Sequence, residues 1–386
     1  MARLGEICKF QSGGTPAKSD SSFYGGNIPW ITTVALNGSL INDDDAVDWI
    51  TEKAINNSAA KIVPENSVMV GTRVGIGKVA RNCIPMSTSQ DIISLIGIDE
   101  NIWDKDYICK FIGSKNDYLN SQARGATIKG IKIEILDKLE VPNLGIAQQK
   151  RVSSIIDKVN TLISLRQQQL EKLNQLVKSR FIEMFGMPGE DTKGWGFTRL
   201  GDCCELNPKK GNESRLKKDF MVSFVPMQAV SENGSMDASN TKSFDDVKMG
   251  FTYFADGDVI FAKITPCMEN GKGAVAKGLK NGIGFGSTEF HILRPIGGIS
   301  NPYWIYAVTS FKQFRHDAAA NMTGSAGQRR VPASYLNNYR ISLPPITLQN
   351  HFAAFVSQVD KSKFEIQQSL EKLEILKKSL MQKYFG

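Results

Sequence analysis

The chain has 386 residues, of which 41% are hydrophobic and 22% charged. This length provides for two to three domains with cores of their own, and the composition argues against an intrinsically disordered chain. No stretch approaches the roughly 18 uncharged apolar residues of a membrane span, and the N-terminus lacks the apolar segment of a signal peptide. We therefore expect a cytoplasmic, globular protein.

Charge and cysteine content narrow the class further. The formal net charge is +8, which suggests a polyanionic partner. Residues 1–145 nevertheless carry 15 basic and 17 acidic side chains, so a polyanion-binding surface there must be a local patch. Six cysteines and three histidines, without a Cys-x-x-Cys pair, predict neither a zinc site nor a disulfide framework. We interpret the cysteines as reduced thiols, most of them buried.

The first 145 residues have the pattern of a mixed α/β domain. Short apolar runs, among them the strand-like stretches Ser67–Val70 and Ile92–Ile96, are separated by turn signals such as Gly13-Gly14-Thr15-Pro16. Strands this short and unevenly spaced predict an irregular sheet.

From Gln148 to Phe185 the pattern changes to one long amphipathic helix. Apolar residues recur at alternating steps of four and three, and Arg166 and Arg180 interrupt the stripe. A helix of about 35 residues is on the order of 50 Å long. A stripe sustained over this length predicts a coiled-coil seam.

The second half of the chain repeats this order at a fixed offset of 200 residues. Gapless superposition of the two helical segments matches Leu170–Leu173 with Leu370–Leu373, and Phe185-Gly186 with Phe385-Gly386. Repetition at one fixed offset indicates a duplicated architecture.

The globular parts share only short anchors. Leu4-Gly5-Glu6 corresponds to Leu200-Gly201-Asp202, and Met86–Gln90 corresponds to Phe285–Glu289. Between these anchors the two sequences are largely unrelated. We therefore expect one shared frame that carries two different surfaces.

The predicted fold is α/β (α+β), with two globular domains separated by two long antiparallel coiled-coil helices in a pseudo-two-fold tandem repeat. The predicted segments are, in chain order, 1–145, 146–186, 187–345 and 346–386. Antiparallel pairing would put the two domains at opposite ends of a rod, and one turn of B-DNA is about 34 Å, so such a rod would space two half-sites. The alternative is that each helix packs only on its own domain.

The chain resembles the specificity subunit of type I restriction-modification systems. The resemblance covers essentially the whole chain and rests on the tandem layout, the two domain openings, the segment Thr265–Lys272, the Leu343-Pro344-Pro345 turn followed by Gln349, and the Phe-Gly helix endings. The first copy differs at the turn, which reads Val141-Pro142-Asn143-Leu144 and is followed by Gln148-Gln149.

The resemblance implies two target recognition domains, each reading one half of a split double-stranded DNA site. The paired helices would set the spacer and bind two modification subunits. Those partners would bind S-adenosylmethionine and methylate adenine, and restriction subunits using ATP and Mg²⁺ would translocate and cut DNA. The chain itself would be non-catalytic and would hold no cofactor.

Direct inspection for catalytic motifs agrees with this division. Asn301-Pro302-Tyr303-Trp304 is close to the Asn-Pro-Pro-Tyr signature of amino-methyltransferases but lacks the second proline, so it better fits a helix start. Asp246-Val247-Lys248 fits the tail of a nuclease motif, yet such triplets arise by chance in charged loops. No nucleophile–histidine constellation is apparent, and we interpret as core or surface residues His291, His316 and His351.

Candidate DNA contacts lie at glycine-rich turns in both domains. Gly71–Lys78 resembles a phosphate loop but lacks the Walker spacing, and it predicts a turn at the edge of a sheet. Glycine lets the backbone approach a phosphate, while Lys and Arg supply charge. The candidates are Thr72, Arg73, Lys78 and Arg81 in the first domain and Lys263, Thr265, Lys272 and Lys277 in the second. For any one of them the alternative is a solvated side chain on a turn.

A second group of candidates precedes each long helix. These loops carry polar and basic groups suited to phosphates and base edges, namely Arg124 and Lys129 in the first domain and Gln328, Arg329 and Arg330 in the second. Hydrogen bonds to bases are further expected from Ser87, Thr88, Gln90, Ser287 and Thr288, of which Gln90 suits adenine. The alternative role of these residues is strand termination.

Two other features are candidates for functional roles. A basic loop in the second domain, solvated or in contact with phosphate, contains Lys209, Lys210, Arg215, Lys217 and Lys218. Apolar residues outside the helix seam are candidate contacts for a modification subunit: Leu162, Leu165, Leu176 and Phe181. The competing functional hypotheses are a coiled-coil protein-protein adaptor without DNA specificity and, disfavoured by the missing motifs, a self-sufficient nuclease or methyltransferase.

Overall fold

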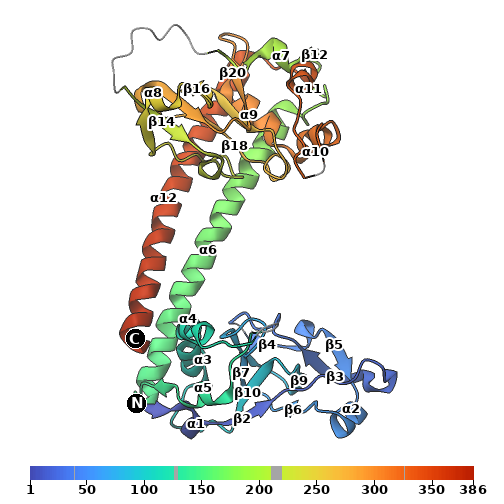
Figure 1. Cartoon of the computed structure of the whole chain (residues 1–386), viewed down its shortest axis with the longest axis vertical. Helices are drawn as coiled ribbons and strands as arrows, with labels where there is room; N and C mark the ends of the chain where they lie inside the picture. Colours follow the sequence, from blue (N-terminus) through green and yellow to red (C-terminus); the bar gives the residue numbers. More distant parts are fainter. Residues whose placement is uncertain (39, 126–128, 210–219, 326) are drawn as a thin grey trace. The chain divides into compact units, whose positions relative to one another are not determined.

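The computed structural model describes residues 1–38, 40–125, 129–209, 220–325 and 327–386. It divides into two compact units, one formed by Met1–Leu165 with Ser369–Gly386 and the other by Arg166–Gln368. Each unit contains one globular domain and a part of each long helix (Figure 1). Residues 1–145 are called the first domain below, and residues 187–345 the second domain.

The two long helices are α6 (Ile146–Phe185) and α12 (Ile346–Phe385), each of 40 residues. They confirm the predicted helices at the predicted offset of 200 residues. Both end at a Phe-Gly pair, and Gly186 has a φ of +82°, a conformation that glycine adopts easily at a helix C-terminus.

The helices pair in antiparallel fashion inside each unit. In the first unit, Val152 and Ile156 near the start of α6 share a core with Phe385 at the end of α12. In the second unit, the ring of Phe181 near the end of α6 lies 5.5 Å from the ring of Phe352 near the start of α12. The beginning of one helix therefore meets the end of the other, as the sequence predicted.

The first domain contains three sheets. Their strand orders are β2-β10-β7-β8-β4, β5-β3-β9-β6 and β1-β11. The strands are β1 Ala2–Arg3, β2 Lys9–Ser12, β3 Tyr24–Ile31, β4 Leu40–Ile41, β5 Asp48–Ile50, β6 Ile62–Val63, β7 Val68–Gly71, β8 Val79–Asn82, β9 Met86–Thr88, β10 Ile92–Ile96 and β11 Glu140–Val141. The two predicted strand-like stretches are thus found as β7 and β10, at the centre of the largest sheet.

The first domain also contains short helices. They are α1 Leu4–Ile7, α2 Glu52–Asn57, α3 Lys105–Ser114, α4 Asn116–Ser121 and α5 Ile133–Asp137. The apolar face of α3, with Tyr107 and Phe111, packs with the sheet residues Val68 and Leu95 in one buried cluster. Phe385 of α12 joins the same cluster, and its ring lies 5.1 Å from that of Tyr107. The end of the chain is therefore part of the core of the first unit.

The second domain repeats this element order in part, because its described residues form ten strands and those of the first domain form eleven. Its strand orders are β13-β20-β17-β18, β15-β14-β19-β16 and β12-β21. The strands are β12 Phe197–Arg199, β13 Cys204–Leu206, β14 Met221–Val225, β15 Thr241–Ser243, β16 Thr252–Ala255, β17 Val259–Ala262, β18 Gly273–Val275, β19 Ile283–Gly286, β20 Phe290–Pro295 and β21 Arg340–Ser342. The helices are α7 Leu200–Cys203, α8 Phe244–Val247, α9 Pro302–Ser310, α10 Lys312–Ala320 and α11 Ala333–Asn338.

The shared domain openings have a structural reason. A Cβ atom at Gly5 would lie 1.9 Å from a carboxylate oxygen of Asp137 in α5, and one at Gly201 would lie 2.1 Å from the amide oxygen of Asn337 in α11. Only glycine lets α1 and α7 approach these side chains so closely. The preceding strands β1 and β12 pair with β11 and β21, respectively. The Leu-Gly-Glu and Leu-Gly-Asp motifs therefore seal each domain where it joins its long helix.

The cysteine thiols are partly buried, as the sequence predicted for most of them. Of the six free cysteines, Cys8, Cys203 and Cys204 are buried, whereas Cys83 is exposed. Burial raises the pKa of the Cys8 thiol to about 12. Within the described ranges, no helix combines the length and the apolar character that crossing a membrane requires.

Candidate nucleic-acid interface

The structure brings together the two basic segments of the first domain. The turn after β7 and the loop before α5 meet where the Ile131 amide donates to the carbonyl oxygen of Thr72 at 2.8 Å. Arg124 and Gly130 exchange two backbone hydrogen bonds of 3.0 and 2.9 Å, which close the second loop into a hairpin. A Cβ atom on Gly130 would lie 3.0 Å from Cγ of Arg73. Segments about 50 residues apart in sequence thus form one surface.

The basic side chains on this surface are accessible. The Arg73 side chain is 51% exposed, and Lys78, Arg124 and Lys129 are exposed as well. Arg73 Nη1 lies 3.8 Å from a carboxylate oxygen of Asp91, at the limit of an ion pair. Among the described residues, Lys78, Arg124 and Lys129 form no ion pair. Unneutralised cations on a loop surface are suited to phosphate groups.

The second domain builds the corresponding surface with the same backbone hydrogen bonds. The Val331 amide donates to the carbonyl oxygen of Lys263 at 2.9 Å, as Ile131 does to Thr72. The Lys263 amide donates to the carbonyl oxygen of Glu289 at 2.9 Å, as Thr72 does to Asp91 at 2.8 Å. The two repeats therefore place a turn, a carboxylate residue and a hairpin loop in the same arrangement.

The hairpin loop of the second domain is also fastened to its turn. Thr323 and Arg330 exchange backbone hydrogen bonds of 3.0 and 2.8 Å, and the Thr265 amide donates to the carbonyl oxygen of Arg329 at 3.0 Å. The Thr265 hydroxyl donates to the same oxygen at 3.2 Å. Thr265 therefore holds this loop in place.

Charge is distributed differently in the second domain. Arg330 binds Glu289 through two parallel hydrogen bonds, from Nε at 2.9 Å and from Nη2 at 2.8 Å. The hydrogen bonds from Arg330 lower the pKa of the Glu289 carboxyl. Arg329 Nη2 lies 3.5 Å from Glu269. Lys272 is half-buried, and its ammonium donates to the carbonyl oxygen of Met227 at 3.4 Å.

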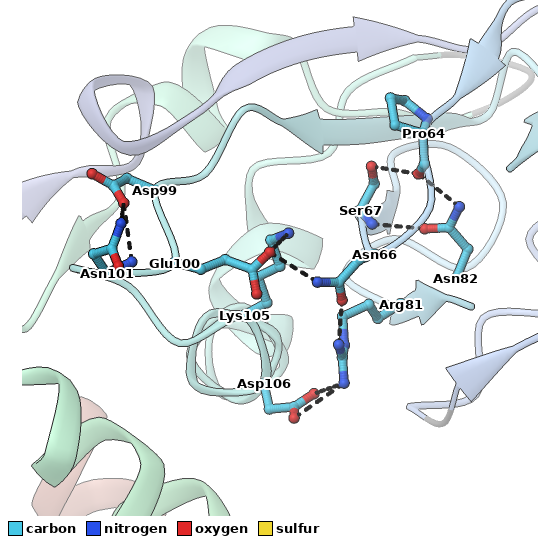
Figure 2. Close-up of polar contacts among 10 residues, drawn as sticks. All are labelled: Pro64, Asn66, Ser67, Arg81, Asn82, Asp99, Glu100, Asn101, Lys105 and Asp106. Atoms are coloured by element: carbon cyan, nitrogen blue, oxygen red, sulfur yellow. Dashed lines mark hydrogen bonds and ion pairs between the residues drawn. The ribbon is translucent and has the colours of Figure 1, made fainter. Parts of the chain in front are cut away.

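Arg81, predicted as a DNA contact, takes part in an internal network. Figure 2 shows its guanidinium donating to the Asn66 side chain and forming an ion pair with Asp106 at 3.1 Å. Asn66 in turn donates to Glu100 at 3.0 Å, and Glu100 binds Lys105 at 2.6 Å. These bonds fix α3 against β8, so Arg81 has a structural role.

Several predicted hydroxyl contacts are inaccessible. Ser87 and Thr88 lie in the middle strand β9, between β3 and β6, and are 0% exposed. Thr72 is buried as well, and its hydroxyl donates to the carbonyl oxygen of Asp91 at 3.2 Å. Ser287 accepts a 3.2 Å hydrogen bond from the Glu289 amide, which is the alternative role in a turn. The exposed members of the predicted polar set are Gln90, Thr288 and Gln328.

Lys277 binds a long helix. Its ammonium lies 3.1 Å from a carboxylate oxygen of Asp360 in α12, as both an ion pair and a hydrogen bond. These bonds fasten the second domain to α12 within the second unit. Lys277 is therefore better explained as a structural tether than as a DNA contact.

Phe181 was predicted as part of the partner surface, and its burial shows that this prediction was wrong. It is 2% exposed and packs with Phe185, Phe311 and Phe352, so it belongs to the core of the second unit. The other three residues of the predicted partner surface are exposed: Leu162 at 45%, Leu165 at 48% and Leu176 at 47%. In the predicted basic loop, Lys209 is exposed, and outside the described residues lie Lys210, Arg215, Lys217 and Lys218.

Asn301 and His291, both considered as possible catalytic residues, have structural roles. The Asn301 side chain accepts a 3.0 Å hydrogen bond from the Tyr303 amide and caps α9, which confirms the predicted helix start. His291 is buried: Nε2 lies 2.9 Å from the carbonyl oxygen of Val331, and Nδ1 lies 3.1 Å from Nδ2 of Asn207. His316 and His351 are exposed.

Sequence reasoning missed the acidic residues of the two surfaces. Asp91, Glu269 and Glu289 each contact an arginine of the candidate surface. The available signal was positional, because Glu289 closes the second anchor where Gln90 closes the first. Carboxylates are not expected to contact DNA phosphates, which are also negatively charged, so cations and neutral polar groups were the predicted contacts.

The fold is a duplicated frame that carries two basic loop surfaces of different composition. The family described as "Type I restriction modification DNA specificity domain" matches this chain twice, at residues 1–175 and 192–377. The chain therefore belongs to the type I restriction-modification DNA specificity family.

Individual relatives cover parts of the chain. It is 40% identical over 174 residues to the type I restriction enzyme EcoEI specificity subunit of Escherichia coli, which covers 45% of this chain and 29% of that protein. It is 39% identical over 194 residues to the EcoAI specificity subunit of the same species, which covers 48% of this chain and 32% of that protein. The matched segments thus span about a third of these relatives' lengths.

A solved structure covers the whole fold. The crystal structure of the type I restriction-modification S subunit from M. genitalium superposes with a TM-score of 0.57 and 12% sequence identity. The superposition covers 100% of this chain and 95% of that one. At this identity the likeness concerns the fold alone.

Proposed function

We propose that this chain is the DNA-specificity subunit of a type I restriction-modification complex. Each domain would read one half of a bipartite DNA target, and the chain would perform no chemistry itself. The observation that carries the proposal is the pair of equivalent loop surfaces. The same hydrogen bonds, Ile131 to Thr72 and Val331 to Lys263, build both surfaces, yet their side chains differ.

Equivalent frames with different side chains suit a split site with unlike halves. Phosphate contacts position a protein on DNA, and base-edge contacts supply the sequence preference. In the first domain, Arg73, Lys78, Arg124 and Lys129 offer charge, and the exposed Gln90 offers an amide that can pair with adenine. In the second domain the accessible groups are Lys263, Thr288, Gln328 and Arg329.

The long helices would serve assembly. Leu162, Leu165 and Leu176 expose apolar surface on α6, which suits contact with modification subunits. Those subunits would bind S-adenosylmethionine and methylate adenine, while restriction subunits would use ATP and Mg²⁺. The segments 1–145 and 187–345 would be the target recognition domains, with 146–186 and 346–386 as the spacer. Such a complex would act on cellular DNA in the cytoplasm.

The proposal is tested by sequencing the methylome of a methylation-free host. One strain expresses the chain with its modification subunit, and the control strain expresses the modification subunit alone. A split motif with two unlike halves and a fixed gap, present only with the chain, is the expected result. An assembled complex that adds no methylation would favour the protein-protein adaptor instead.

A further inference from the structure

The arginines of the second domain are paired with carboxylates of the same surface. Glu289 accepts two hydrogen bonds from Arg330, at 2.9 and 2.8 Å, and Gln328 accepts a third from its Nη1 at 3.0 Å through the carbonyl oxygen. Arg329 lies 3.5 Å from Glu269. Each of the two arginines therefore has an acidic partner in a turn beside its loop.

The pairing occupies the edge of Arg330 that DNA would use. A guanidinium recognises guanine or a phosphate through two parallel N–H donors, the same geometry that binds a carboxylate. In Arg330 the Nε and Nη2 donors already bind Glu289 in this way. DNA can engage this edge of Arg330 only by displacing Glu289.

Other interactions restrict the positions of both Glu289 and Glu269. Glu289 also supplies the carbonyl oxygen that accepts the Lys263 amide at 2.9 Å, so its backbone is fixed to the turn. Glu269 is half-buried, and its Oε2 atom is buried without a hydrogen-bond partner among the described residues. A buried carboxylate oxygen without a hydrogen-bond partner is stabilised by a nearby cation. Arg329 and Arg330 are thus held by carboxylates that they stabilise in the folded protein.

The first domain lacks this degree of neutralisation. Among the described basic residues of its candidate surface, Arg73 forms a single ion pair, with Asp91 at 3.8 Å. Arg124 and Lys129 form no ion pair within the described ranges. The same frame therefore presents open cations in the first domain and internally paired arginines in the second.

We propose that Glu289, supported by Glu269, is a positioning residue that determines the specificity of the second domain. Glu289 holds Arg330 in one orientation and competes with DNA phosphates for it. DNA that offers only phosphates gains little at this surface, whereas a cognate half-site also offers base-edge hydrogen bonds that offset the lost pair. The first domain, with its open cations, supplies the larger share of salt-sensitive, sequence-independent affinity. This inference rests on the proposed DNA-specificity function.

The test uses Glu289→Gln in the complex with modification subunits. Glutamine keeps the shape and one acceptor but removes the charge that competes with phosphate. Binding of a random-sequence duplex, followed by fluorescence anisotropy at several salt concentrations, should tighten severalfold. The slope of log Kd against log salt should steepen by about 0.9, the value for one additional phosphate contact. Methylome sequencing should show the motif relaxed in one half only.

Glu205→Gln is the matched control, because it removes an exposed carboxylate from β13 of the same domain. It should leave both the salt slope and the motif unchanged. If Glu289→Gln lowers the yield of assembled complex, Glu269→Gln tests the same effect through Arg329. An unchanged slope and motif in a correctly assembled Glu289→Gln complex would refute the proposal. A wild-type complex that methylates no split motif would refute the proposed function instead.

Discussion

Gln149 and Gln349, 200 residues apart, make the same three hydrogen bonds. The Gln149 side chain accepts from the Asp104 amide at 2.9 Å and donates to the carbonyl oxygens of Ile102 and Leu144 at 2.9 and 2.7 Å. Both glutamines are 0% exposed. Each therefore links the first turns of a long helix to the loop that precedes α3 or α9.

The bonds of Gln349 complete the correspondence. It accepts from the Asn301 amide at 2.9 Å and donates to Ile299 at 3.0 Å and to Pro344 at 2.8 Å, both through carbonyl oxygens. A buried amide with all these partners satisfies three backbone groups at once. The glutamine after each domain thus fixes the direction in which its long helix leaves.

Gln149→Leu and Gln349→Leu should each destabilise the fold. Leucine has a similar size but leaves three backbone groups, each at least partly buried, without partners, so a loss of about 2–4 kcal/mol is expected for each. Urea unfolding followed by circular dichroism measures the change. Gln148→Leu, at an exposed neighbouring position, is the control and should stay within about 0.5 kcal/mol of the wild type. Equal effects at positions 148 and 149 would contradict the assignment.

Substitutions of Phe181 and of Leu176 should have different effects, because Phe181 lies in the core and Leu176 on the proposed partner surface. Phe181→Ala removes a ring packed between α6, α12 and the second domain and should cost about 3–5 kcal/mol. Leu176→Ser alters an exposed side chain and should leave stability nearly unchanged while weakening capture of the modification subunit. Thermal melts and co-purification measure the two effects. Full retention of capture by Leu176→Ser, Leu162→Ser and Leu165→Ser together would exclude this face as the docking surface.

His291 should make stability depend on pH. Burial lowers the pKa of its imidazole below the ordinary value of 6.5, so the folded state favours the neutral ring. Below pH 6.5 the unfolded chain binds a proton that the folded chain does not, and stability is lost as the pH falls. The neutral His291 side chain makes its full contribution to the free energy of unfolding above pH 6.5. His291→Gln should show a smaller loss between pH 7.5 and 5.5 in urea unfolding.

His316→Gln is the control for that experiment. The side chain of His316 is 82% exposed, so this substitution leaves the buried imidazole of His291 in place. Its pH profile should therefore follow the wild type. Identical profiles for the wild type and His291→Gln would show that the buried imidazole does not contribute.

Lys277 and Lys129 should differ in their effect on DNA binding. Lys129→Gln removes an exposed cation of the first surface, so the slope of log Kd against log salt should fall by about 0.9. Lys277→Gln removes a cation bound to Asp360, so the slope should not change. Filter binding with a random-sequence duplex gives both values. A reduced slope for Lys277→Gln would restore Lys277 as a phosphate contact.

The repeated frame was predictable because its determinants are local. The four-three spacing specifies the long helices, and the 200-residue offset places Gln149 opposite Gln349 before any coordinates are considered. The openings Leu4-Gly5-Glu6 and Leu200-Gly201-Asp202 were recognised as anchors. Their reason, close contact of each glycine with a side chain of α5 or α11, depends on packing between segments more than 100 residues apart.

The candidate surfaces were predicted only in part. The basic turns and the basic hairpin loops were found separately, but their contact through Ile131 and Val331 is tertiary and has no sequence signal. The other errors arose because the sequence does not show which polar side chains are buried or paired in the fold. Ser87 and Thr88 look accessible as a polar run, yet β9 is covered on both edges by β3 and β6. Arg81 and Lys277 resemble free cations until their partners Asp106 and Asp360 are placed beside them.

The most direct test of the account compares methylomes of three strains that express the complex. One carries the wild-type chain, one carries Arg73→Ala with Lys78→Ala, and one carries Lys263→Ala with Arg329→Ala. If each domain reads its own half-site, the first variant relaxes or loses one half of the motif and the second variant affects the other half. Uniformly lower methylation at every wild-type site in both variants, with the motif intact, would contradict the assignment of one half-site to each domain.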